Sequence, residues 1–73
     1  MFIKYKNLNG NSKVDSCKIN EYSIDVLFNG CRKIYRYSIQ SAGRANVENL
    51  KRYAINGYGL NSYINKFCKY LYE

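Results

Sequence analysis

The sequence contains no histidine, and this absence limits the chemistry open to the chain. Histidine is the commonest general base, the usual partner of a nucleophile and the commonest metal ligand in proteins. Five residues are acidic: Asp15, Glu21, Asp25, Glu48 and Glu73. They include no adjacent pair, and the surrounding positive charge favours ion pairs over a raised carboxyl pKa. Because no P-loop or dinucleotide fingerprint is present either, we expect a protein that is not an enzyme and uses no cofactor.

Cysteine is sparse and is found only at Cys17, Cys31 and Cys68. Zinc sites take ligand pairs roughly two to four residues apart, and these cysteines form no such pair. An odd, widely spaced set fits reduced thiols better than a disulfide framework. We therefore expect three small buried hydrophobic side chains, no bound metal and a cytoplasmic location.

Long apolar runs are missing as well. None approaches the roughly 20 residues that cross a bilayer, and residues 1–8 are too short and too charged for a signal peptide. At 73 residues the chain suffices for one domain with a modest core. We expect a single domain over residues 1–73 that is not an integral membrane protein.

Positive charge is abundant by contrast. Twelve lysine and arginine residues against five acids give a net charge of +7. Such an excess points to an anionic partner, which is a nucleic acid, an anionic membrane surface or an acidic protein surface. The abundance of Lys and Asn is also typical of an AT-rich genome, so the charge alone does not choose among these partners.

Alternating patterns in the first half of the chain predict β-strands. Residues 2–6 alternate between apolar side chains and lysines, and residues 14–19 form a second strand after a turn at Asn9–Gly10. Residues 22–28 give the clearest pattern, and one face of this strand holds Ile24, Val26 and Phe28.

Asn29–Gly30 predicts a hairpin turn that leads into a return strand over residues 31–39. The preferred register pairs residues of like character: Val26 with Tyr35, Ile24 with Tyr37 and Asp25 with Arg36. These patterns together predict a meander of three or four antiparallel strands.

Apolar spacing in the second half predicts two helices. After a break at residues 41–43, Val47, Leu50 and Ala54 mark the first helix, with Asn46 as its candidate N-cap and residues 56–59 as its end. The second helix has an apolar stripe of Leu60, Ile64, Phe67 and Leu71. The predicted fold class is α+β, an antiparallel three- to four-stranded meander packed against two C-terminal helices.

Several short motifs follow one another in a recognisable order: Ser12-Lys13-Val14, the strand Ile24–Phe28, Asn29-Gly30, Tyr35-Arg36-Tyr37 and Gly57–Asn61. Over residues 12–70 the chain resembles the KTSC domain family, named for a module at the C-terminus of some lysyl-tRNA synthetases. It departs from that pattern by two extra residues before Tyr35 and by the lack of a proline after Tyr37. The resemblance implies a compact sheet-plus-helix fold and an RNA-binding role. It leaves residues 1–11 as an additional N-terminal strand.

Basic and aromatic residues interleave, as in proteins that track phosphates with Lys and Arg and stack bases on rings. The candidate nucleic-acid-binding residues are Arg32, Lys33, Arg36, Arg44, Lys51, Arg52, Lys66 and Lys69. The strand phase places Tyr35 and Tyr37 on the core face and not in a stacking platform. The binding surface is then either the sheet face with Arg32 and Arg36 or the helix N-terminus after Gly59, where free N–H groups suit a phosphate.

The alternative function is a protein–protein interaction module, such as a phage-encoded inhibitor that docks on an acidic surface of a host protein. Exposed tyrosine and arginine side chains make good interface anchors. The strand at residues 2–6 suits edge-to-edge pairing with a partner or a second copy. We expect a monomer or a weak homodimer whose partner is a nucleic acid or a protein.

Overall fold

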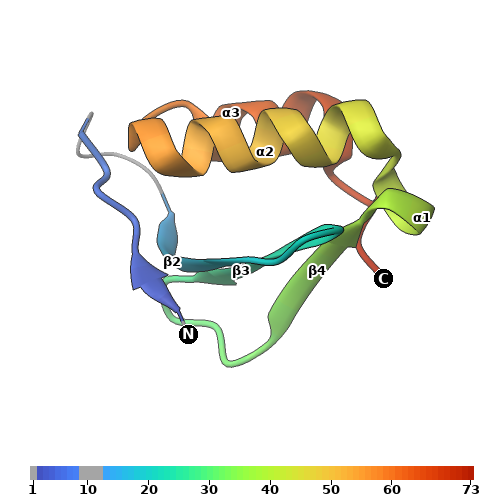
Figure 1. Ribbon diagram of the computed structural model, residues 1–73. Helices are drawn as coiled ribbons and strands as arrows, with labels where there is room; N and C mark the ends of the chain where they lie inside the picture. Colours follow the sequence, from blue (N-terminus) through green and yellow to red (C-terminus); the bar gives the residue numbers. More distant parts are fainter. Residues whose placement is uncertain (1, 9–12) are drawn as a thin grey trace.

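The computed structural model describes residues 2–8 and 13–73, in which a four-stranded antiparallel sheet carries all helices on one face (Figure 1). The strands pair in chain order: β1 (Ile3–Lys4), β2 (Val14–Ile19), β3 (Ser23–Phe28) and β4 (Ile34–Ser38). The predicted α+β fold, a meander followed by helices, is confirmed. The predicted turn at Asn9–Gly10 and the motif residue Ser12 lie outside the described residues.

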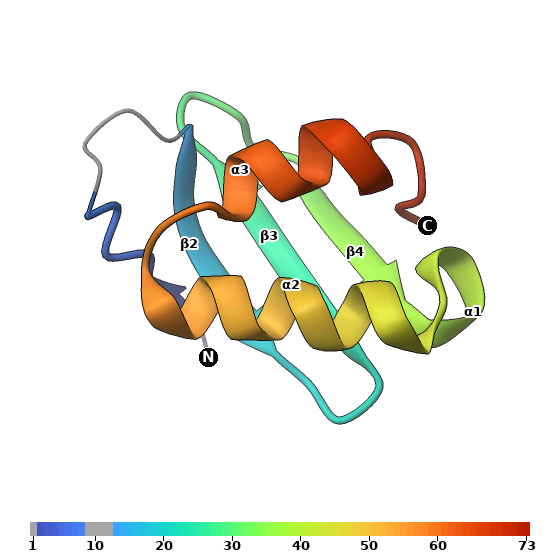
Figure 2. The same cartoon turned by 90° about the horizontal axis from the view of Figure 1, so that it is seen from above.

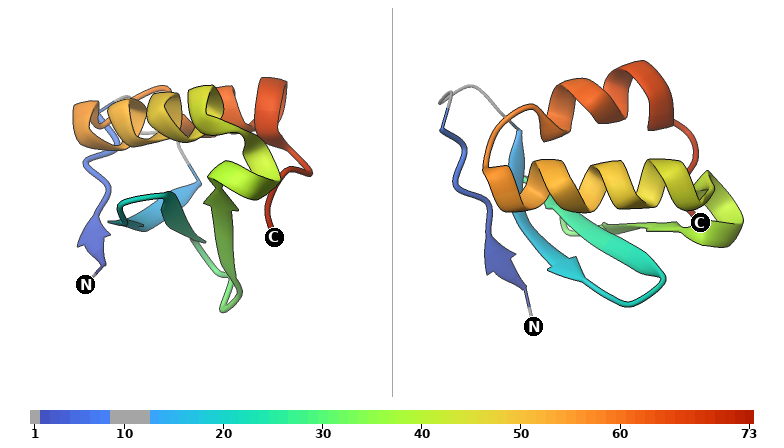
Figure 3. Two further views of the ribbon diagram at one scale, coloured as in Figure 1. Left: turned by 45° about the vertical axis from the view of Figure 1, so that its right-hand side comes forward. Right: turned by 45° about the horizontal axis from the view of Figure 1, so that its top comes forward.

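The helical layer consists of α1 (Ile39–Ala42), α2 (Arg44–Asn56), α3 (Leu60–Tyr63) and the π-helical turn η1 (Ile64–Cys68). Helix α2 and the α3–η1 segment run antiparallel to each other across the sheet (Figure 2). The opposite face of the sheet carries no element of the described chain (Figure 3). Two predicted C-terminal helices are thus present, preceded by a single extra turn.

The β3–β4 hairpin has the predicted register, with Ile24 opposite Tyr37 and Val26 opposite Tyr35. Strand β4 is shorter than the predicted strand over residues 31–39, because residues 31–33 belong to the loop and Ile39 begins α1.

The reason for the early end of β4 is a reciprocal cap between two serines. The backbone N–H of Ser41 donates to Ser38 Oγ at 3.1 Å, and the backbone N–H of Ser38 donates to Ser41 Oγ at 3.0 Å. This capping box turns the chain out of the sheet at Ser38. The next helix does not use the predicted N-cap, because α2 begins at Arg44 and Asn46 lies in its first turn.

A β-bulge in β2 explains the mixed pattern of residues 14–19. Val14 lies opposite Phe28 and Ser16 opposite Leu27, so Asp15 is the extra residue. In a regular strand, residues three apart point to opposite faces. The bulge lets both Val14 and Cys17 point into the core, where each is at most 5% exposed.

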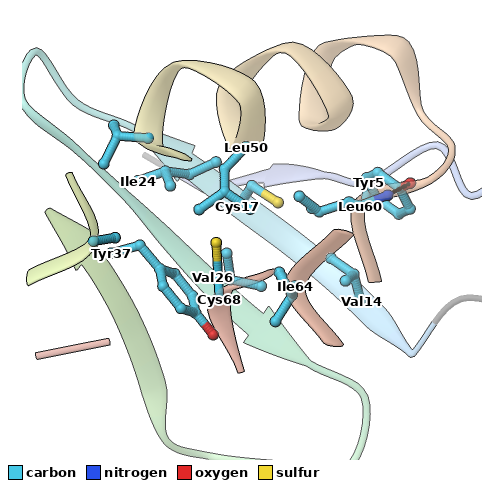
Figure 4. Close-up of a cluster of buried hydrophobic side chains, with 12 residues drawn as sticks. Tyr5, Val14, Cys17, Ile24, Val26, Tyr37, Leu50, Leu60, Ile64 and Cys68 are labelled. Atoms are coloured by element: carbon cyan, nitrogen blue, oxygen red, sulfur yellow. Dashed lines mark hydrogen bonds between the residues drawn. The ribbon is translucent and has the colours of Figure 1, made fainter. Parts of the chain in front are cut away.

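The core lies between the sheet and the helices (Figure 4). Its largest fully buried side chain is Tyr37, which is 1% exposed, and burial raises the pKa of this phenol to about 12. Tyr35 is half-buried, and its ring packs edge-on against Phe28 and Tyr72, with centroid distances of 5.4 and 4.8 Å. Both motif tyrosines therefore support the core, as their strand phase predicts.

The final helix departs from its predicted apolar stripe at η1. Leu60 and Ile64 point inward as expected, but Phe67 is 60% exposed and Cys68 is fully buried. A π-helical turn closes i→i+5 hydrogen bonds and so inserts one extra residue into the turn. This shift gives Cys68 the inward position that regular α-helical spacing assigns to Phe67.

Gly57→Ala is expected to destabilise the fold more than Gly30→Ala. Both glycines have positive φ, 86° and 75°, a region that costs an L-residue about 1–2 kcal/mol. A Cβ at Gly57 would lie 2.7 Å from the Cβ of Lys6, whereas nothing lies within 4 Å at Gly30. The additional steric cost at Gly57 should be about 1–3 kcal/mol, measured as the free energy of unfolding in urea. Equal losses in the two variants would contradict this packing of the N-terminal segment against Gly57.

Candidate nucleic-acid interface

The predicted cationic residues do not form one patch. Arg32 and Lys33 lie in the β3–β4 loop, and Arg36 lies on the uncovered sheet face. Arg44, Lys51 and Arg52 lie along α2, and Lys66 and Lys69 lie on the C-terminal segment. All are exposed except Lys51, which is half-buried and donates from Nζ to the carbonyl of Glu21 at 2.9 Å. The positive charge is therefore spread over several surfaces, which have to be compared one by one.

The uncovered sheet face is largely charge-compensated. Arg36 donates from Nε to Oδ1 of Asp25 at 2.7 Å and from Nη2 to Oδ2 at 3.1 Å. Asp25 is only 3% exposed, and these hydrogen bonds hold the pKa of its carboxyl below the usual value. Arg32 lies in the β3–β4 loop and not on the predicted sheet face. Because the guanidinium of Arg36 is already paired, this face is a weak candidate for phosphate binding.

One groove of about 400 Å³ brings two predicted residues together. Its lining consists of Tyr22, Ser23, Arg36, Ser38, Ile39, Gln40, Arg44 and Glu73. Arg36 is paired with Asp25, and Glu73 adds a carboxylate to the lining that contains Arg44. With so little net positive charge, the groove suits an uncharged polar group better than a phosphate.

At the start of α3, the first N–H group expected to be free after Gly59 already has a partner. The backbone N–H of Leu60 donates to the hydroxyl of Tyr5 at 3.3 Å, and Leu60 itself is fully buried. Burial also raises the pKa of Tyr5, so this phenol stays protonated at neutral pH. The predicted phosphate position after Gly59 therefore lacks the N–H of Leu60, which is buried against the N-terminal segment.

A row of three rings lines the seam between α2 and the α3–η1 segment. Tyr63 lies between Tyr53 and Phe67, with centroid distances of 5.2 and 4.9 Å. The hydroxyl of Tyr63 accepts from Asn49 Nδ2 at 3.0 Å and donates to Asn46 Oδ1 at 2.7 Å. These two hydrogen bonds fix the middle ring, so the row is preorganised.

A shallow hollow of about 180 Å³ accompanies this ring row, which we define as Tyr53, Tyr63 and Phe67. Its remaining lining residues are Gly59, Ser62 and Lys66, and none is acidic. At Gly59 a Cβ would lie 3.1 Å from the Tyr53 ring, so glycine allows the ring to pack against the backbone. The hollow combines ring surface, an exposed ammonium group and no opposing carboxylate.

The cysteines differ from one another. Cys17 and Cys68 are buried as predicted, but the prediction of a buried side chain is wrong for Cys31, which is exposed. The reason is that residue 31 lies in the β3–β4 loop and not in a strand. Within residues 2–8 and 13–73, no three Cys, Asp or Glu side chains are grouped so that they could hold a metal ion. In the same ranges, no helix has both the length and the apolar character needed to cross a membrane.

Comparison with known proteins gives no further guide, because no protein-family model, no curated protein and no solved structure matches the chain. The resemblance to the KTSC family stays a prediction. The function therefore has to be inferred from the surfaces of the molecule itself.

Asp25→Asn should remove part of the acid sensitivity of the fold. Arg36 holds the pKa of Asp25 below its ordinary value of about 3.9. The ion pair therefore contributes its full free energy to folding above that value, and this contribution is lost as the pH falls through the lower folded-state pKa. Urea unfolding between roughly pH 7 and pH 2 should show a steeper loss below about pH 4 in the parent than in Asp25→Asn. Glu48→Gln, which removes an exposed acid, is the control and should keep the parent's profile. An unchanged profile in Asp25→Asn would contradict the assignment.

Only Cys31 should react with a thiol reagent in the folded protein. Burial raises the pKa of Cys17 to about 12 and also raises that of Cys68, and the thiolate is the reactive form. A colorimetric disulfide reagent near pH 8 should count one thiol in the native chain and three in denaturant. Cys31→Ser should reduce the native count to zero. Two or three reactive thiols under native conditions would be incompatible with this packing.

Proposed function

We propose that this protein binds single-stranded nucleic acid, RNA in the first place, along the ring row. The observation that carries the proposal is a row of packed rings beside Lys66, in a hollow whose lining contains no acidic residue. Proteins that bind single strands combine such stacking surfaces with lysines and arginines along the backbone path. The preference for RNA over DNA rests on the resemblance to the KTSC family.

The stacking step is assigned to Phe67, the most exposed ring of the row at 60% exposure. Tyr53 and Tyr63 are half-buried and support Phe67 from behind. Because Asn46 and Asn49 already hold the hydroxyl of Tyr63, the side chain of Tyr63 loses little conformational entropy on binding. A base stacked on Phe67 would gain about 1–3 kcal/mol.

The phosphate contacts are assigned to Lys66, Arg52 and Lys69. Lys66 lines the hollow, Arg52 precedes Tyr53 on α2, and Lys69 follows η1. Within the described chain, the side chains found in ion pairs are Lys4 with Asp15 and Arg36 with Asp25. Lys66 lies beside the rings in a lining without acidic residues, so its charge is available for a polyanion. The ammonium of Lys69 lies 5.5 Å from the centroid of the Tyr70 ring.

Phe67→Ala and Lys66→Ala should each weaken binding of a fluorescently labelled 12-nucleotide RNA, measured by anisotropy. Loss of the stacking ring should raise Kd by about 5- to 150-fold, since each base stack contributes about 1–3 kcal/mol. Loss of Lys66 should raise Kd several-fold. It should also make the slope of log K against log salt shallower by the amount expected for about one phosphate contact.

Two controls make this test specific. Arg32→Ala removes the same charge from the distant β3–β4 loop and should leave Kd nearly unchanged, and urea unfolding should show that all variants remain folded. A single-stranded DNA of the same length tests the preference for RNA. Absence of binding at 50 mM salt, or equal losses in Arg32→Ala and Lys66→Ala, would refute the proposal.

A further inference from the structure

A second surface lies on the other flank of α2, away from the ring row. On one flank of this helix, Asn49 and Tyr53 contact Tyr63 of the neighbouring α3. On the other flank, Lys51 reaches the turn between β2 and β3, and Ile55 lines a hollow shared with β1 and β2. The helix therefore separates two surfaces that share no lining residue.

This hollow, which we call the isoleucine hollow, has a volume of about 250 Å³. Its lining consists of Ile3, Lys4, Tyr5, Lys6, Cys17, Ile19, Ala54 and Ile55. Ile3, Ile19 and Ile55 are 69%, 44% and 63% exposed. Ile3 is exposed even though it lies opposite the buried Cys17 and therefore points to the helical side of the sheet. Helix α2 thus leaves the β1 end of the sheet uncovered, and three aliphatic side chains remain in water there.

The charged side chains that line the isoleucine hollow have one sign. Its lining contains two lysines and no acidic residue. The ammonium of Lys4 is 4.0 Å from Asp15 Oδ1, but its side chain is 85% exposed, and such a surface pair is worth little. Lys6 is exposed, and none of the ion pairs found in the described chain includes it. An apolar depression beside positive charge favours an occupant that is apolar at its centre and acidic at its edges.

We propose that the isoleucine hollow docks an acidic partner protein. The partner inserts an aliphatic or aromatic side chain between Ile3, Ile19 and Ile55, and it sets carboxylates against Lys4 and Lys6. Apolar anchors in pockets with a charged rim are how compact protein interfaces concentrate their affinity. A second copy of this chain would bring its own Lys4 and Lys6 to the contact, and a nucleic acid has no aliphatic side chain to insert.

The experiment uses the synthetic peptide Glu-Glu-Leu-Phe-Glu-Glu and the full chain labelled with ¹⁵N. Addition of the peptide should shift the amide signals of Ile3, Lys6, Ile19 and Ile55 in a saturable manner. The peptides Lys-Lys-Leu-Phe-Lys-Lys and Glu-Glu-Ser-Ser-Glu-Glu should leave these signals in place, because the first has the wrong charge and the second has no anchor. Salt should weaken the binding of the acidic peptide.

Variants locate the peptide on the surface. Ile55→Gln should weaken peptide binding at least 5-fold, and the double change Lys4→Gln with Lys6→Gln should do the same. Ile34→Gln, which removes an isoleucine of similar exposure from the opposite sheet face, is the matched control and should bind as the parent does. RNA binding should be unchanged in Ile55→Gln, and peptide binding should be unchanged in Phe67→Ala, so that failure of either proposal leaves the other testable.

Four results would overturn the proposal. The first is the absence of saturable shifts with the acidic peptide, and the second is equal binding of the lysine peptide. The third is a dimer in sedimentation equilibrium whose formation shifts the same amides, which would make a second copy the occupant. The fourth is saturation of the hollow by decanoate without any peptide binding, which would make it a site for a small amphipathic anion.

Discussion

The burial of one face of the β3–β4 hairpin under the helices is the constraint on which the rest of the structure depends. Ile24, Val26 and Tyr37 are at most 1% exposed. The register places Ile24 opposite Tyr37 and Val26 opposite Tyr35, so these side chains share one face of the sheet. Slippage of β4 by a single residue would turn Tyr37 to the face opposite the one that holds Ile24 and Val26. A chain of 73 residues has little other apolar surface to bury, so this register is what holds the helices α2 and α3 above the sheet.

Both candidate surfaces arise because the helical layer is narrower than the sheet and has a seam of its own. At the β1 end, α2 leaves Ile3 and Ile19 uncovered. Between α2 and the α3–η1 segment, the seam is closed from outside by rings and not by aliphatic side chains. The π-helical turn η1 determines which side chain is exposed at this seam, because it buries Cys68 and turns Phe67 outward. A regular α-helix would bury the ring on which the proposed stacking depends.

The sequence alone predicts those parts of the fold that repeat with a period. Alternation and the Asn29–Gly30 turn predict the phase of β3 and β4 but allow a loop of two or of four residues. The pairing of Asp25 with Arg36 and of Val26 with Tyr35 favours the observed register. The bulge at Asp15 and the π turn at η1 each insert one residue into a period, and the serine cap at Ser38 ends the strand early. A pattern search that assumes a constant period cannot locate such steps.

The candidate site was less accessible to sequence reasoning than the fold, because charge counts say nothing about pairing. Arg36 ranks with Lys66 as a basic residue in sequence, yet Arg36 is held by a buried carboxylate, whereas Lys66 faces a hollow with no acid. The one available signal was the spacing of Tyr63 and Phe67, four residues apart on one helical segment. Of the cations outside ion pairs, Lys66 lies beside rings on one flank of α2 and Lys6 lies beside isoleucines on the other. Because rings suit bases and isoleucines suit an apolar anchor, the two proposals assign different partners to the two flanks, and the two surfaces share no lining residue.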